Sequence, residues 1–197
     1  SRLTAINAVA LGYNALGELA SRFQAGTTNR YYHNYALSLA PIVAERNGTG
    51  GAFLRYYIWS PGGRLLYMID AANGNAVYHF HFDRVGSTLA LTSAAGAVTD
   101  AYAYTPYGEL LGRTGTNAQP FTYVGAFGVR SEPTANLYHM RARYYEPVSA
   151  RFISRDPVWP VLTEPRSLDP YQYAFGSPEI FIDPAGLFAR GLKYDEN

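Results

Sequence analysis

The sequence predicts an all-β protein in which antiparallel hairpins of about 22 residues repeat along one curved sheet. Three observations predict this fold class: the aromatic composition, the supply of turn residues and a recurring tract. The chain has 18 Tyr, against 10 Phe and 2 Trp. Tyrosine has high strand propensity and joins an apolar ring to a polar tip, which suits partly buried strands. The 19 Gly and 12 Pro supply many turns.

The recurring tract consists of an aromatic residue, three or four further residues, a glycine and then a leucine. It occurs at residues 13–19, 59–65, 82–89 and 104–110. Its glycines stand at positions 17, 63, 86 and 108, so the steps between them are 46, 23 and 22 residues. The first step spans two periods, with a degraded copy near residues 35–39. Each glycine is expected to turn the chain with a positive φ angle.

The segments between these glycines alternate in the manner of strands, as at residues 65–69 and 77–82. Second turns are predicted at residues 47–51, 73–75 and 94–96. Each period therefore adds one hairpin, and a unit this small needs neighbours on both sides to bury its face. A β-sandwich or barrel with turns at short spacing is the alternative, and the recurring register favours the repeat array.

Composition and charge exclude several classes of protein. A content of 48% hydrophobic and 16% charged residues excludes a disordered tail. The formal net charge is +1 and the basic residues are scattered, so we predict no nucleic-acid or anionic-membrane partner. The chain has no Cys and no apolar run long enough to span a bilayer. It begins without an initiator Met or a signal-peptide core, so we expect a fragment of a larger protein. No cofactor is predicted.

The last third of the chain carries the most specific motifs. Residues 138–147 read YHMRARYYEP, residues 151–157 read RFISRDP, residues 171–178 read YQYAFGSP and residues 183–187 read DPAGL. With the repeated tracts, this order resembles the RHS/YD-repeat family and its RHS-repeat-associated core. That core is found in Rhs effectors, in the C subunits of insecticidal toxin complexes and, more distantly, in teneurins.

The resemblance implies a hollow, spiralling β-shell that is closed by the core and encloses a variable C-terminal toxin. In the bacterial members the core often cuts the chain after the Asp-Pro-x-Gly-Leu motif, here between Leu187 and Phe188. The implied division is residues 1–130 for repeats, 131–187 for the core and 188–197 for the start of the toxin segment. The implied partners are that toxin segment, the remainder of the shell, and a secretion system or toxin complex. The implied location is export from a bacterium.

The resemblance also implies an aspartic-type, single-turnover autoprotease with a pair of Asp residues and an adjacent Arg. Arg155 and Asp156 correspond to the first half, and Asp169 is the nearby candidate for the second carboxylate. Asp183, with Pro184 and Gly186, belongs to the recognition turn before the cut and is the reserve candidate. Two carboxylates in one site can divide their pKa values, so that one stays protonated while the other activates water.

Two features depart from the family pattern. Glu146 stands where the family usually has Asp, and residues 158–168 form a longer, proline-rich segment. This insertion can displace Asp169 from a catalytic position.

The alternative interpretation of the aspartates is structural. Asp156, Asp169 and Asp183 each precede a proline, and Asp-Pro pairs favour turns. Arg155 and Asp156 would also point to opposite faces of an extended strand. On this interpretation the protein is a non-cleaving YD-shell module for adhesion or for binding protein or carbohydrate, and whether the chain is an enzyme stays open.

Two further constellations favour structural roles. Of the candidate ligands His33, His79 and His81, the last two lie on one face of a predicted strand. No carboxylate or third His lies at suitable spacing from them, so no metal site is predicted. The pairs at residues 31–32, 56–57 and 144–145 are tyrosines that could stack on sugars, but interior packing of repeat strands is favoured.

Overall fold

The computed structural model describes residues 3–48, 50–158 and 165–191. Within these ranges, no helix is long and apolar enough to cross a membrane. The regular structure consists of strands and short 3-10 turns. This confirms the predicted all-β class.

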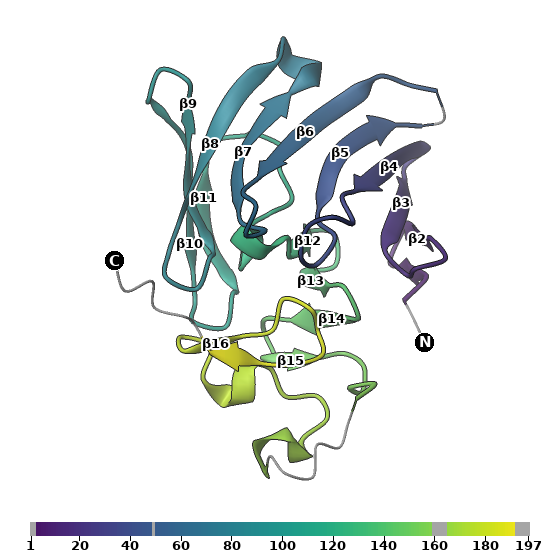
Figure 1. The fold of residues 1–197 in the computed structure, drawn as a ribbon, viewed down its shortest axis with the longest axis vertical. Coiled ribbons are helices and arrows are strands. Elements are labelled where there is room, and N and C mark those ends of the chain that lie inside the picture. Colours follow the sequence, from purple (N-terminus) through teal and green to yellow (C-terminus); the bar gives the residue numbers. More distant parts are fainter. Residues whose placement is uncertain (1–2, 49, 159–164, 192–197) are drawn as a thin grey trace.

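One large antiparallel sheet contains eleven strands that follow one another in chain order. The strands are β1 (Ala5–Ile6), β2 (Val9–Tyr13), β3 (Leu19–Gln24), β4 (Thr27–His33), β5 (Ile42–Asn47), β6 (Phe53–Trp59), β7 (Leu65–Asp70), β8 (Ala76–Phe82), β9 (Thr88–Ser93), β10 (Val98–Tyr104) and β11 (Leu110–Thr114). Figure 1 shows that the sheet curves into an arch. This arrangement confirms the predicted curved sheet of hairpin repeats.

The repeat glycines occupy equivalent turns. Their φ angles lie between +77° at Gly63 and +90° at Gly108, as the tract predicted. Each turn opens with a polar side chain that accepts the backbone N–H four residues later, at distances of 2.7 to 3.1 Å. These residues are Asn14, Ser60, Asp83 and Thr105. The register between strands shifts beside the aromatic residue of each tract. Each copy is therefore a tight turn combined with a β-bulge.

The degraded copy forms a longer loop between β4 and β5. Eight residues, 34–41, stand where five, 60–64, form a regular turn. The Asn34 amide still donates to the Pro41 carbonyl at 3.0 Å, which corresponds to the bond from Ser60 to Arg64. Leu39 and Ala40 have positive φ angles of 64° and 38°. The loop keeps the base of a regular turn but takes a different path beyond it.

The remaining elements form two small sheets at one end of the arch (Figure 1). The first contains β12 (Arg130–Glu132), β13 (Leu137–Met140), β14 (Arg143–Glu146) and β15 (Arg151–Phe152), and the second contains β16 (Phe181–Ile182) and β17 (Arg190–Gly191). The 3-10 turns are η1 (Ala71–Asn73), η2 (Gly125–Phe127), η3 (Pro165–Leu168) and η4 (Ala174–Gly176).

Two apolar clusters join these parts. In the first, Phe121 packs edge-on against Tyr57 and Trp59 of β6, with ring centroids 4.8 and 5.6 Å apart. In the second, tyrosines of the small sheet stack, and Tyr145 lies 4.4 Å from Tyr173 between centroids. Each tyrosine pair noted in the sequence has at least one buried member, so the expected interior packing is confirmed for Tyr31, Tyr57, Tyr144 and Tyr145.

The repeat turn at residues 105–109 rests directly on this tyrosine cluster. The hydroxyls of Tyr138, Tyr145 and Tyr123 donate to the carbonyls of Gly108, Tyr107 and Pro106 at 2.8, 2.7 and 3.0 Å. Burial raises the pKa of Tyr138 to about 12, so its hydroxyl stays protonated and able to donate. A Cβ atom on Gly108 would lie 2.6 Å from the Tyr123 ring. Gly108 thus provides both a positive φ angle and room for the ring.

We predict that Gly108→Ala lowers the free energy of unfolding by about 2–4 kcal/mol, because it combines left-handed strain with overpacking against Tyr123. Gly96→Ala is the matched control. Gly96 has a φ angle of +82° in a turn with the same hydrogen bonds, and a Cβ there meets nothing within 4 Å. Its loss should be about 1 kcal/mol. Urea unfolding measures both, and equal losses would contradict the seating of this turn on Tyr123.

Candidate functional site

Arg143 on β14 is the centre of a buried charged site. Its side chain is 3% exposed, and Nη2 lies 3.0 Å from Asp156 Oδ2 and 3.1 Å from Asp183 Oδ2. Its Nε donates to the Gly186 carbonyl at 2.6 Å, and Nη1 donates to the Pro170 carbonyl at 3.1 Å. One guanidinium therefore brings together two carboxylates that are far apart in the sequence. We name this group, with the backbone of residues 186–188, the Arg143 site.

Asp183 lies directly beside the predicted cleavage point. Its Oδ1 accepts the amide N–H of Leu187 at 3.0 Å and that of Phe188 at 3.2 Å. Burial raises the pKa of the Asp183 carboxyl, although these two N–H groups and Arg143 act in the opposite direction. Asp183 therefore binds a proton more readily than an ordinary aspartate, and it contacts the nitrogen of the bond between Leu187 and Phe188.

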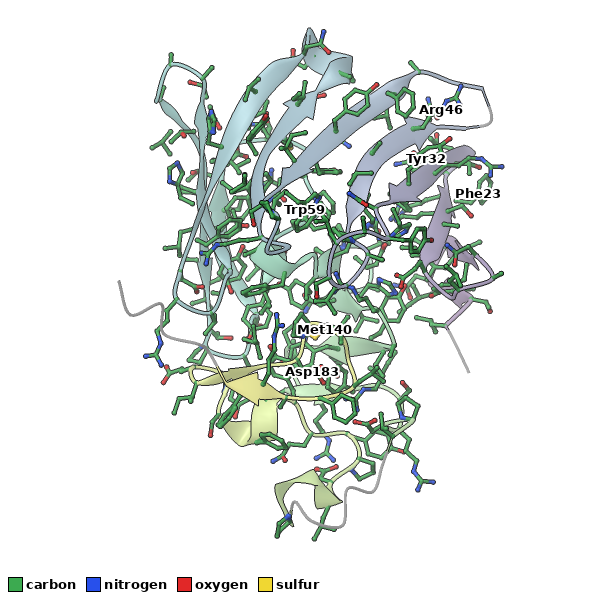
Figure 2. All side chains as sticks on the ribbon, in the orientation of Figure 1. Phe23, Tyr32, Arg46, Trp59, Met140 and Asp183 are labelled. Atoms are coloured by element: carbon green, nitrogen blue, oxygen red, sulfur yellow. The ribbon has the colours of Figure 1, made fainter. Side chains whose placement is uncertain are left out.

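The segment before that bond is held by the hairpin between β13 and β14. Three successive carbonyls, of Pro184, Ala185 and Gly186, accept hydrogen bonds from Arg141 Nη1, the Ala142 amide and Arg143 Nε at 2.7, 3.1 and 2.6 Å. Gly186 has a φ angle of +66°, and a Cβ there would lie 2.3 Å from the Met140 carbonyl oxygen. The glycine of the motif is thus required for contact with the hairpin. Figure 2 labels Met140 and Asp183 in this part of the molecule.

Asp156 makes both a turn contact and an ion pair. Its Oδ1 accepts the Val158 amide at 2.9 Å, which is a turn contact, while its Oδ2 pairs with Arg143. The Asp156 amide donates to the Pro170 carbonyl at 2.9 Å, which ties this turn to the next segment. Arg155 is exposed. The arginine that joins Asp156 to Asp183 is Arg143, which the sequence reasoning did not select.

Asp169 occupies a different place. Its two oxygens lie 2.9 and 2.8 Å from Arg151 Nη2, in a pair that is 39% exposed on the Asp169 side. Its Oδ1 also accepts the Tyr171 amide at 3.0 Å. The structure therefore brings Asp156 and Asp183 together and places Asp169 on Arg151. Residues 159–164 of the predicted insertion lie outside the described residues.

A cavity of ≈180 Å³ adjoins the site. Its lining includes Arg143, Tyr144 and Ser154. It is large enough to hold water molecules, and polar groups line it.

The three histidines considered as metal ligands make other contacts. His33 lies 2.8 Å from the Ala40 carbonyl and 3.0 Å from the Leu19 carbonyl. His79 packs on Tyr67, and His81 Nε2 lies 2.9 Å from Thr92 Oγ1. Among the residues that the structure describes, no three His, Cys, Asp or Glu side chains form a metal-binding group.

The family model of the teneurin YD-shell matches residues 5–178 of the chain. Salivary gland surface protein 1 of Aedes aegypti is 33% identical over 133 residues, which cover 68% of this chain and 4% of that protein. Toxin protein Tse5 of Pseudomonas aeruginosa is 30% identical over 119 residues, which cover 60% of this chain and 8% of that protein. The chain thus spans less than a tenth of the length of these two relatives.

The structure also resembles a solved toxin. The Tc holotoxin pore of Photorhabdus luminescens superposes with a TM-score of 0.61 at 17% identity, over 98% of this chain and 11% of the toxin chain. At this identity the likeness shows a shared fold.

The raised pKa of Asp183 predicts a characteristic pH dependence of stability. A carboxyl whose pKa is higher in the folded chain than its ordinary 3.8 stabilises the fold fully below pH 3.8, and this contribution is lost as pH rises through the folded pKa. Asp183→Asn should remove this dependence. As pH rises above 3.8, the unfolding free energy of Asp183→Asn minus that of the wild type should therefore increase. Urea titrations at several pH values would measure this difference. Asp169→Asn serves as an exposed control, and a difference that shifts the other way would refute the buried-carboxyl assignment.

Proposed function

Because the chain belongs to the teneurin YD-shell family, we propose that it forms the closing end of a bacterial toxin shell and cuts its own chain once between Leu187 and Phe188. The observation that carries the proposal is the position of Asp183, whose carboxylate contacts the Phe188 nitrogen and shares Arg143 with Asp156. The toxin relative and the toxin-like fold support the bacterial shell.

The proposed reaction is the hydrolysis of one peptide bond. Asp156 takes a proton from a water molecule, and the water oxygen attacks the Leu187 carbonyl carbon. Protonated Asp183 gives its proton to the Phe188 nitrogen as the C–N bond breaks. The products are a Leu187 carboxylic acid and a Phe188 amine. The hairpin contacts along residues 184–186 supply the orientation that ordinary enzymes obtain by binding a substrate.

The proposal divides the chain into repeats at residues 1–130, a core at 131–187 and the start of the enclosed toxin at 188–197. The edge strands β1 and β11 each have one neighbour in the described sheet, so their other edges can pair with the remainder of the shell. The further partners in this proposal are a secretion system or a toxin complex, and the shell is exported from the bacterium.

A non-cleaving shell for adhesion is the second candidate. The relative from Aedes aegypti is described as a surface protein. The outward rings of Phe23, Tyr32 and Phe53 are 47%, 41% and 37% exposed. Tyr32 and Phe53 lie 5.9 Å apart between centroids, and Figure 2 labels Phe23, Tyr32 and Arg46 on the strands around them. Such a surface can stack on sugars or contact protein, but it requires no cut at Leu187.

Intact-mass analysis of the natural full-length protein tests the proposal. The wild type should separate into two chains after Leu187, and Asp156→Asn and Asp183→Asn should each abolish the cut. Asp169→Asn, which alters a carboxylate outside the Arg143 site, is the control and should still cleave. A wild-type protein that keeps its full mass would end the autoprotease proposal. If Asp169→Asn alone abolished the cut, Asp169 would replace Asp183 as the second carboxylate.

A further inference from the structure

Arg141 lies in an unusual backbone position. It occupies the tight turn between β13 and β14 with a φ angle of +49°. This left-handed conformation disfavours side chains larger than glycine, asparagine or aspartate. A long side chain in such a place points to a role for the side chain itself.

The guanidinium of Arg141 bonds three segments that are distant in the sequence. Its Nε donates to the Leu39 carbonyl at 2.7 Å, Nη2 to the Phe127 carbonyl at 3.0 Å and Nη1 to the Pro184 carbonyl at 2.7 Å. Leu39 belongs to the loop between β4 and β5 of the repeat sheet, Phe127 to η2, and Pro184 to the segment before the proposed cleavage point. Every guanidinium nitrogen thus contacts a different part of the fold, and the rigid fork fixes the three carbonyls relative to one another.

The neighbouring backbone is adapted to this contact. A Cβ on Gly128 would lie 2.8 Å from Arg141 Nη2, so glycine leaves room for the guanidinium. The Leu39 carbonyl comes from the irregular loop at residues 34–41, which has three residues more than the regular turn at 60–64. The left-handed Leu39 and Ala40 are part of that longer path. The longer loop thus carries the Leu39 carbonyl that Arg141 binds.

We propose that Arg141 is a positioning residue that makes self-cleavage depend on the folded repeats at residues 1–130. The Leu39 and Phe127 carbonyls orient the guanidinium, and the oriented guanidinium then holds Pro184, three residues before the cleaved bond. Without the folded repeats, the Leu39 and Phe127 carbonyls are absent, and the segment at 184–188 loses its fixed path past Asp183. The shell therefore closes before the chain is cut. The link to cleavage rests on the proposed function. The three hydrogen bonds from Arg141 to the Leu39, Phe127 and Pro184 carbonyls, which we call the clamp, do not.

The test compares three variants in the natural full-length protein. The first replaces residues 34–41 with the sequence of residues 60–64, which restores a regular turn and removes the Leu39 contact while leaving Arg141 intact. The second is Arg141→Lys. The third, Arg22→Lys, is the control, because Arg22 also joins the sheet to the core, through Glu132 at 2.9 Å, without contacting residues 184–188. Urea unfolding verifies that each variant is folded.

The first two variants should cleave at least about tenfold more slowly than the wild type, since each loses charge-assisted bonds that orient the segment. The control should stay within about twofold. The pH profile of cleavage should keep its shape in all variants, because a positioning residue changes the geometry and not the titration of the carboxylates. The proposal would be overturned if the folded turn-replacement variant cleaved at the wild-type rate, or if Arg22→Lys slowed cleavage equally.

A second readout separates the clamp from the proposed function. In an Asp156→Asn background, dilute thermolysin, which cuts before large apolar residues, reports how often the segment around Phe188 opens. The turn replacement and Arg141→Lys should each raise this rate about tenfold or more, and Arg22→Lys should not. Unchanged rates would show that the clamp is wrong. Raised rates in this background, together with a wild-type protein that keeps its full mass, would keep the clamp and refute the autoprotease.

Discussion

The seating of the repeat turn at residues 105–109 on the tyrosine cluster is the constraint on which the rest of the fold depends. A turn with a glycine at a positive φ angle presents bare backbone, so an aromatic ring can lie against it. The turn at residues 105–109 uses this space for Tyr123, and the hydroxyls of Tyr138 and Tyr145 bond its carbonyls. Because Tyr138 and Tyr145 belong to β13 and β14, the same contacts set the position of the hairpin between these strands.

That hairpin in turn builds the Arg143 site. It carries Arg141 in its tight turn and Arg143 at the start of β14, and both guanidinium groups bond the segment at residues 184–186. Burying Arg143 and Asp183 has a desolvation cost, which their mutual contact and four further hydrogen bonds offset. Removing Arg143 would leave Asp183 with only its two backbone N–H donors, whereas removing Asp183 would leave Arg143 paired with Asp156. A rigid support of this kind suits chemistry that occurs once, within one chain.

The sequence predicted the features that depend on local backbone rules. The glycine register predicted the turns, and the degraded copy near residues 35–39 became the long loop. The family motif indicated Asp156 and the segment ending at Leu187. The sequence offered the grouping of Asp156 with Asp183 only as a reserve to Asp169, because the grouping depends on Arg143, which lies forty residues before Asp183. Order along the chain suggested Asp169, but its bond to Arg151 arises from a local pairing next to β15. The sequence signal for Arg143 was a pair of arginines, at positions 141 and 143, that flank a single residue.

Native-state hydrogen exchange tests most directly whether the repeat turn at residues 105–109 and the segment at residues 184–188 form one cooperative unit. An Asp156→Asn protein is used so that the proposed cut is blocked. In the structure the amides of Leu187 and Phe188 donate to Asp183, and the amide of Gly108 donates to the Thr105 carbonyl. We expect all three amides to open with the same free energy and to respond in parallel to low concentrations of urea. Rapid exchange at Leu187 and Phe188, with Gly108 still protected, would show that the segment is a free tail and would contradict this account.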